Sequence, residues 1–155
     1  MMTKIESLNK MREKGAYDAL ELQSKAVAGT VTQTEIIDQE MAVPAFNPEK
    51  DYSSWSIGSP VSDEGQVWLL LTPYNAAHNA GRPSELRSLW GLAHTTNPEK
   101  AKPFIAPYGV SGIYFQGECC TDPNYIDPKQ VFISKVDNNS YAPSEYLANW
   151  ELYTV

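Results

Sequence analysis

PSELRSLWGL (residues 83–92) and PSEYLANWEL (residues 143–152) are two versions of one ten-residue frame. Each begins with Pro-Ser-Glu, places a tryptophan seven residues after the proline, and has a leucine two residues after that tryptophan. A frame that recurs in this way is the signature of an internal repeat. It predicts that the second half of the chain holds two small modules rather than one large core.

The match continues upstream of both frames. Gln-Val-Trp at residues 66–68 corresponds to Gln-Val-Phe at residues 130–132, and WSIG at residues 55–58 corresponds to YFQG at residues 114–117. Valine and aromatic residues are enriched in strands, so each Gln-Val-aromatic motif predicts a central strand. Four landmarks therefore recur in one order.

The repeat divides the chain of 155 residues into four parts. We expect a helical assembly segment and tether at 1–50, a first β module at 51–93, a connector at 94–111 and a second β module at 112–155. Modules of this size are near the lower limit for a self-supporting core and need dense aromatic packing. We expect four aromatic residues to supply it as core anchors: Trp68, Trp90, Phe132 and Trp150.

The N-terminal part predicts two helices. Thr3 and Glu6 form a capping-box pattern that starts a helix over residues 3–28, and Gly29 is suited to end it. A second helix is expected from Thr32 or Thr34 to about Met41, with Glu35 completing a second capping box. Apolar residues recur along the first helix at steps compatible with one stripe: Ile5, Leu8, Met11, Ala16, Leu20 and Val27.

A stripe this thin cannot hold an isolated helix in water. It must be buried against the second helix, against the following module, or against copies of itself. We favour self-association, which predicts a homo-oligomer assembled through the N-terminal helices.

Composition excludes several classes of protein. A net charge of −7 without a Lys/Arg cluster argues against nucleic acid as a partner. No apolar run is long enough to span a membrane, and the N-terminus has no apolar core of a secretion signal. The adjacent Cys119 and Cys120 are expected to be buried thiols, and the two histidines, His78 and His94, have no metal-ligand spacing. We therefore expect no metal and no cofactor.

The order of the landmarks resembles the small carbohydrate-binding modules of chitinases, families 5 and 12. The first copy carries Trp55, Gly58, Val61, Trp68, Pro83 and Trp90, and the second carries Tyr114, Gly117, Cys120, Phe132, Pro143 and Trp150. The chitin-binding members have an exposed aromatic pair just after the central strand. Of such a pair, residues 69–74 and 133–138 retain only Tyr74.

The whole arrangement resembles a group of small bacteriophage and prophage tail or baseplate proteins. Those proteins have a helical N-terminus that ends in a segment like VPAF (residues 43–46), and an LWxLxH connector like residues 89–94. The resemblance implies an α+β chain in which a helical segment precedes two small, mainly β, carbohydrate-binding-module-like repeats. It also implies that the protein contacts a sugar or forms part of a particle.

A sugar site needs an aromatic ring beside planar polar groups, because C–H faces stack on rings and hydroxyls need partners. The loops before the two frames meet that description at equivalent places. The alternative is that these residues shape turns and cover the edge of each module. Our candidate carbohydrate-binding residues are Tyr74, Asn75, Asn79, Asn138, Asn139 and Tyr141, followed by Trp55 and Tyr114.

Catalysis is not expected. Glu85 and Glu145 could suggest the carboxylate pair of a glycosidase. Each glutamate belongs to its own copy of the frame, however, and more simply caps the turn after the frame serine. No phosphate loop, nucleophile elbow or metal triad is present.

These observations predict a non-enzymatic structural component of a phage tail tip, baseplate or tail-like particle. It would be made in the bacterial cytoplasm, become part of the virion, contact other tail proteins and display its modules for attachment to host-surface glycans. The alternative is a stand-alone accessory carbohydrate-binding protein without a particle role.

Overall fold

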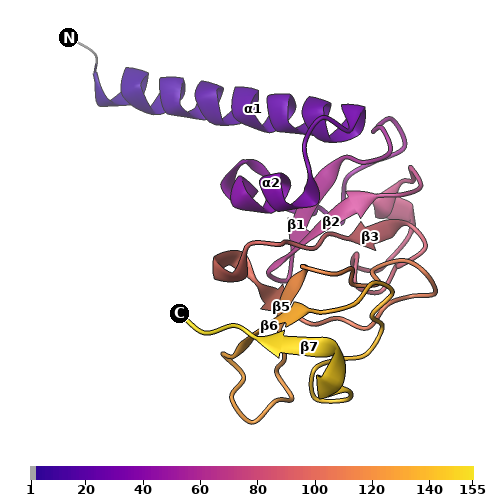
Figure 1. Ribbon diagram of the computed structural model, residues 1–155. Helices are drawn as coiled ribbons and strands as arrows, with labels where there is room; N and C mark the ends of the chain where they lie inside the picture. Colours follow the sequence, from indigo (N-terminus) through magenta and orange to yellow (C-terminus); the bar gives the residue numbers. More distant parts are fainter. Residues whose placement is uncertain (1–2) are drawn as a thin grey trace.

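The structure, a computed structural model, describes residues 3–155. Two helices precede two small sheets, which confirms the expected α+β class (Figure 1). The helices are α1 (Lys4–Ala28) and α2 (Gln33–Asp38), with short 3-10 turns η1 (Glu40–Ala42), η2 (Ala76–His78), η3 (Pro98–Lys100) and η4 (Leu147–Asn149). The strands are β1 (Pro60–Asp63), β2 (Gln66–Leu70), β3 (Trp90–Leu92), β4 (Lys102–Pro103), β5 (Cys119–Thr121), β6 (Val131–Ser134) and β7 (Trp150–Leu152).

Both predicted capping boxes are present. The Thr3 hydroxyl accepts from the Glu6 N–H at 3.1 Å, and the Glu6 carboxylate accepts from the Thr3 N–H at 2.9 Å. Thr32 and Glu35 make the same reciprocal pair at the start of α2. Gly29 ends α1 in the left-handed conformation at φ 71°, which glycine adopts without a Cβ penalty. The second helix is shorter than predicted, because the chain tightens into η1 after Asp38.

The two sheets share one register. In the antiparallel sheet β1-β2-β3, Trp68 is paired with Val61 on one side and with Leu92 on the other. In β5-β6-β7, Phe132 is paired with Cys120 and Leu152 in the same way. Trp90 and Trp150, which begin the last strand of each sheet, are here called the closing tryptophans. They are also paired equivalently, because Leu70 opposes Trp90 and Ser134 opposes Trp150.

The glycine of each aromatic-x-x-Gly landmark has one role in both copies. Gly58 and Gly117 adopt φ of 95° and 92°, a region that side chains other than hydrogen rarely tolerate. Their N–H groups donate to the central strand, Gly58 to the Leu70 carbonyl at 2.8 Å and Gly117 to the Ser134 carbonyl at 2.9 Å. Each glycine therefore fixes the entry of the chain into its first antiparallel strand.

Each closing tryptophan packs against one tyrosine and one phenylalanine, and this aromatic trio recurs in both modules. Trp90 also meets Tyr74 edge-on at 6.1 Å and 80°. Tyr52 meets Trp90 edge-on at 5.4 Å and 88°, and Tyr114 meets Trp150 at 5.4 Å and 70°. A phenylalanine stacks on each tyrosine, Phe46 at 5.9 Å and Phe104 at 5.3 Å. Edge-to-face contacts of this kind add about 0.5–1.5 kcal/mol each to the burial of the rings.

The aromatic trio changes the alignment of the repeat. By its contacts Tyr114 corresponds to Tyr52, whereas the sequence motif had matched it with Trp55. The phenylalanines also enter equivalently, because the N–H of Phe46 donates to the Ser62 carbonyl and that of Phe104 to the Thr121 carbonyl, both at 2.8 Å. A short parallel pairing thus begins each copy, at residues 44–46 and 102–104.

The central strand of the first module is buried on both faces. Trp68 and Leu70 point into the aromatic core, which is one buried cluster. Val67 lies in a second cluster under the helices, with Leu22, Ile36, Ile37, Val43 and Ala93. In β6, Phe132 and Ser134 are buried while Val131 and Ile133 are only partly covered, so the second sheet shows the predicted alternation.

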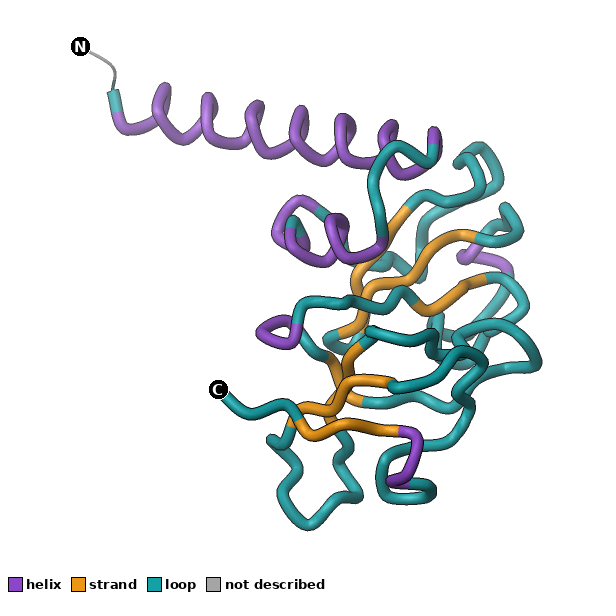
Figure 2. The backbone as a smooth tube through the Cα atoms, viewed as in Figure 1, coloured by secondary structure: helices purple, strands orange, loops and turns teal. Residues whose placement is uncertain are grey.

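Polar contacts fix the modules to each other and to α2. The Lys102 Nζ donates to Glu40 at 2.8 Å and to the Gly65 carbonyl at 2.8 Å. Gln33 accepts from the His94 N–H at 2.8 Å, and the Cys119 N–H donates to the Thr95 carbonyl at 2.8 Å. Figure 2 shows the two sheets following each other directly, with α2 beside their junction. The modules therefore form one body and not beads on a flexible linker.

We predict that Trp90→Phe and Trp150→Phe each lower the free energy of unfolding by about 1–3 kcal/mol, because each removes buried volume and an indole hydrogen bond. The bonds at stake run from Trp90 Nε1 to the Tyr74 hydroxyl at 2.8 Å and from Trp150 Nε1 to the Tyr141 carbonyl at 2.9 Å. Urea unfolding followed by fluorescence measures both variants. A Trp150→Phe protein as stable as the parent would contradict the equivalence of the two modules.

Candidate functional site

The loop before the first frame turns its candidate residues inward. Tyr74 is 9% exposed, and its hydroxyl accepts the indole hydrogen bond of Trp90. Asn75 Oδ1 accepts from the Ala77 N–H at 3.1 Å, and Asn79 Nδ2 donates to the Asn75 carbonyl at 2.8 Å. The ring is part of the core and the amides hold the turn, so this loop offers no free ring face to a sugar.

The loop before the second frame is built differently. Tyr141 of this loop and Tyr146 of the frame are 54% and 51% exposed, and their rings meet at 6.1 Å and 64°. We call these two residues the tyrosine pair. Asn138 is exposed at φ 54°, whereas Asn139 is buried and its Nδ2 donates to Ser134 Oγ at 3.0 Å. Here the aromatic surface and one amide remain accessible to a ligand.

A further exposed ring lies on the strand pair that leads to this loop. Tyr114 and Asn139 form a β-bridge, and both side chains point into the core. Phe115, the residue after Tyr114, is 51% exposed, as expected where side chains alternate along extended chain. Phe115 was not among the candidates, because nothing in the sequence distinguished an outward ring from a core one.

The two aromatic-x-x-Gly rings are not equivalent. Trp55 is half-buried, meets Tyr52 edge-on at 4.8 Å, and has the Lys50 ammonium 5.2 Å from its ring centre. Tyr114 is 2% exposed and lies flat against His94 at 3.7 Å. Burial raises the pKa of Tyr114 well above its usual value, and the nearby Cys120 adds to this. Tyr114 is a core residue, while Trp55 keeps part of its ring at the surface.

Both frame glutamates cap their turns. Glu85 Oε1 accepts from the Arg82 N–H at 3.1 Å, and Glu145 Oε1 accepts from the Ala142 N–H at 3.1 Å. The two residues occupy the same place in separate modules. Each carboxylate therefore holds a turn within its own module.

The adjacent cysteines are buried and not bonded to each other, as the sequence predicts. Burial, together with the carboxylate of Glu118, raises the pKa of Cys119 to about 11. Burial also raises the pKa of Cys120, and Asp122 adds to this effect. Both groups therefore stay protonated at neutral pH, where a thiol is a poor nucleophile and a poor metal ligand.

Because these thiols are buried, we expect the folded protein to lose stability at alkaline pH. The pKa of Cys119 in the folded protein lies above its usual value of 9.0. The protonated thiol therefore contributes fully to the free energy of unfolding below about pH 9, and this contribution is lost as the pH rises through about 11. We predict that Cys119 alone lowers the free energy of unfolding by about 2–3 kcal/mol over this range and that Cys120 adds to the fall, measured by urea titration at several pH values. A Cys119→Ala variant should fall less steeply, and equal slopes would contradict the assignment.

The predicted apolar stripe of α1 is exposed, and a different residue anchors the helix. Leu22, which is not one of the residues of the predicted stripe, is 2% exposed and packs with α2 and β2. Leu8 and Met11 share its face by helical spacing, yet both are exposed, because the N-terminal half of α1 projects beyond α2 (Figure 1). The helix thus presents apolar surface that the rest of the chain does not cover.

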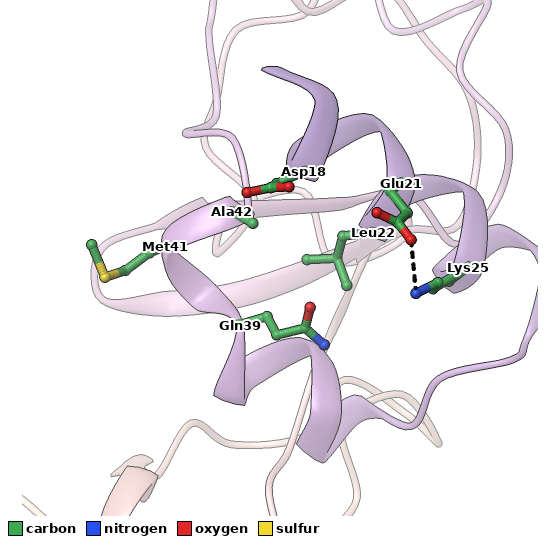
Figure 3. Close-up of a pocket in the computed structure, with 7 residues that line it drawn as sticks. All are labelled: Asp18, Glu21, Leu22, Lys25, Gln39, Met41 and Ala42. Atoms are coloured by element: carbon green, nitrogen blue, oxygen red, sulfur yellow. Dashed lines mark ion pairs between the residues drawn. The ribbon is translucent and has the colours of Figure 1, made fainter. Parts of the chain in front are cut away.

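A hollow of about 350 Å³ lies between α1 and η1. Figure 3 shows Leu22 pointing into it from α1, Gln39 below, and the Glu21–Lys25 ion pair at its side. Met41 at its edge is fully exposed. Most of its lining is charged or polar: Asp18, Glu21, Lys25 and Gln39.

Neither a scan against protein-family models nor a search of curated proteins finds a match to this chain. Over residues 3–155, no helix is both long and apolar enough to cross a bilayer. In the same part of the chain, no group of three or more His, Cys, Asp or Glu side chains is arranged to hold a metal ion.

Proposed function

We propose that this protein is a non-enzymatic structural component of a phage tail tip, baseplate or tail-like particle. Its two modules, similar to chitinase carbohydrate-binding modules of families 5 and 12, would face host-surface glycans. The observation that carries the proposal is the pairing of two tryptophan-closed units in one rigid body with a helix that projects away from them. A body of this kind suits display at the surface of an assembly.

The exposed face of α1 supports the assembly role. Apolar side chains in the projecting half carry exposed fractions of 71% for Ile5, 52% for Leu8 and 69% for Met11. Most of the stability of a helix in a protein comes from packing of its apolar face, and these three side chains are exposed. Contact with another copy, or with a neighbouring tail protein, would bury these side chains and stabilise the free half of the helix.

The tyrosine pair supports the attachment role. Tyrosine combines an apolar ring with a hydroxyl and loses little conformational entropy on binding, because it has only two side-chain torsions. Tyr141 and Tyr146 are exposed on a loop that the frame and the buried Asn139 hold in place. A ring pair on a fixed loop is a suitable contact for the C–H faces of sugars.

The second candidate is a stand-alone accessory carbohydrate-binding protein. The same tyrosine pair favours it, since glycan contact does not require a particle. The two functions differ in the state of α1: a monomer that binds glycan favours the accessory role, and a homo-oligomer or a complex with a tail protein favours the structural one.

We predict that replacing Ile5, Leu8 and Met11 together by glutamine reduces a homo-oligomer to monomer, as measured by light scattering. Glutamine keeps helix propensity, so circular dichroism should show unchanged helix content. The matched control replaces the polar residues Ser7, Asn9 and Lys10 by glutamine in the same turns. Point substitution is sharper than removal of residues 1–42, which would also delete the buried Ile36 and Ile37.

An unchanged mass for the apolar triple variant would contradict self-association through α1. If the parent protein is itself a monomer, pull-down of tail proteins from particles, with and without the triple substitution, tests the remaining form of the assembly role. Loss of capture with the apolar variant and not with the control is the expected result.

We predict that Tyr141→Ala and Tyr146→Ala each weaken binding to host cells by about 0.5–1.5 kcal/mol, the scale of one aromatic contact. Binding of the labelled protein to host cells measures this without knowledge of the glycan. Tyr108 is 58% exposed at another turn, so Tyr108→Ala is the matched control. Equal binding by all three variants would remove the tyrosine pair from the site.

A further inference from the structure

The first module has a hollow beside its frame that the proposed function has not used. It measures about 320 Å³ and is lined by Phe46, Pro48, Gly81, Arg82 and Glu85. This is at the small end of the range of about 300–1,000 Å³ in which proteins hold small molecules. Apolar and planar polar groups converge here, which none of the candidates chosen from the sequence achieves in this module.

One wall of the hollow is a fixed aromatic ring. Phe46 stacks on Tyr52 at 5.9 Å and 11°, meets Trp90 edge-on at 5.9 Å and 84°, and remains half-exposed. Because the core holds the ring on one side, contact on its free surface would cost little further ordering. Pro48 extends this wall with a second rigid apolar group.

The opposite wall is polar and equally constrained. Arg82 directs Nε and Nη2 to the carboxylate of Asp63 at 3.1 and 3.0 Å, and Nε also lies 3.1 Å from Glu64. Glu85 uses Oε1 to accept from the Arg82 N–H. The guanidinium and the second oxygen of Glu85 are thus held at the hollow without rearrangement, as donor and acceptor for a hydroxyl.

Charge restricts what the hollow can bind. Three carboxylates, Asp63, Glu64 and Glu85, surround the single guanidinium of Arg82, so the local charge is minus two. A phosphate or carboxylate would have to displace Asp63 from a two-bond contact and approach the other two acids. The net charge of −7 on the whole chain acts in the same direction.

We propose that this hollow binds a pyranose unit that is uncharged or carries an amine, and that it rejects phosphate-bearing and carboxylate-bearing polymers. The inference rests on the proposed function and narrows it to the class of glycan. The sugar face would lie on Phe46, and its hydroxyls or amine would reach Glu85 and Arg82.

The duplication supplies matched controls. Phe104 and Glu145 occupy the places of Phe46 and Glu85 in the second module, with the same stacking and the same capping bond. Ala142 stands where the first module has Arg82, so the guanidinium of the polar wall is missing there. Substitutions at these paired positions therefore disturb equivalent structure and differ in the proposed binding.

The test is an amide NMR titration of the full chain with three probes: tri-N-acetylchitotriose, which is neutral, chitotriose, which carries amines, and poly(glycerol phosphate), which is anionic. The first two should shift the amides of Phe46, Gly81, Arg82 and Glu85, and the third should not. Phe46→Leu should weaken binding by about tenfold, the scale of one aromatic contact, while Phe104→Leu should not. Glu85→Gln should reduce the preference for chitotriose, while Glu145→Gln should leave it unchanged.

Amide shifts confined to the tyrosine pair would contradict sugar binding at the hollow, but they would not contradict the proposed function. The hollow is also overturned if none of the three probes shifts its amides, or if poly(glycerol phosphate) binds there. Because the map is made on the parent protein, it does not depend on how well Phe46→Leu folds. Binding of the labelled protein to host cells decides the proposed function separately.

Discussion

The edge-on contact between a closing tryptophan and a core tyrosine is the constraint on which both modules depend. Each module is too small to bury much surface, and the structured chain has no disulfide to assist it. Trp90 on Tyr52 and Trp150 on Tyr114 join the last strand of a sheet to the segment that enters it. The phenylalanine stacked on each tyrosine completes a trio that substitutes for a larger core.

With the trio conserved between the copies, the loops are free to differ. The same Pro-Ser-Glu frame follows the buried Tyr74 in one module and the exposed Tyr141 in the other, and the second frame itself carries the exposed Tyr146. The frame is preceded by Arg82 in one and by Ala142 in the other, and in the first module Arg82 and Glu85 line an acidic hollow with an aromatic wall. This is the usual division of labour in which a rigid scaffold carries variable loops.

The junction makes these two surfaces parts of one rigid object. Lys102 connects the second module to Glu40 and to the turn at Gly65, and α2 covers the outer face of β2. Two weak sites held at fixed separation bind a repeating polymer more strongly than either alone, provided that the spacing fits. Self-association through α1 would multiply the same effect.

Local chemistry in the sequence was enough to determine the helix starts, the two sheets, their central strands and the duplication. Capping boxes, strand alternation and the Pro-Ser-Glu frame act through neighbouring residues, so they can be read without a fold. Only the tertiary structure decided which aromatic rings face inward. Tyr114 takes the position in the second module that Tyr52, and not Trp55, takes in the first, because loops of unequal length bring the two tyrosine rings to equivalent places. Phe46 and Glu85 likewise meet only because the folded chain brings residues far apart in sequence to one hollow.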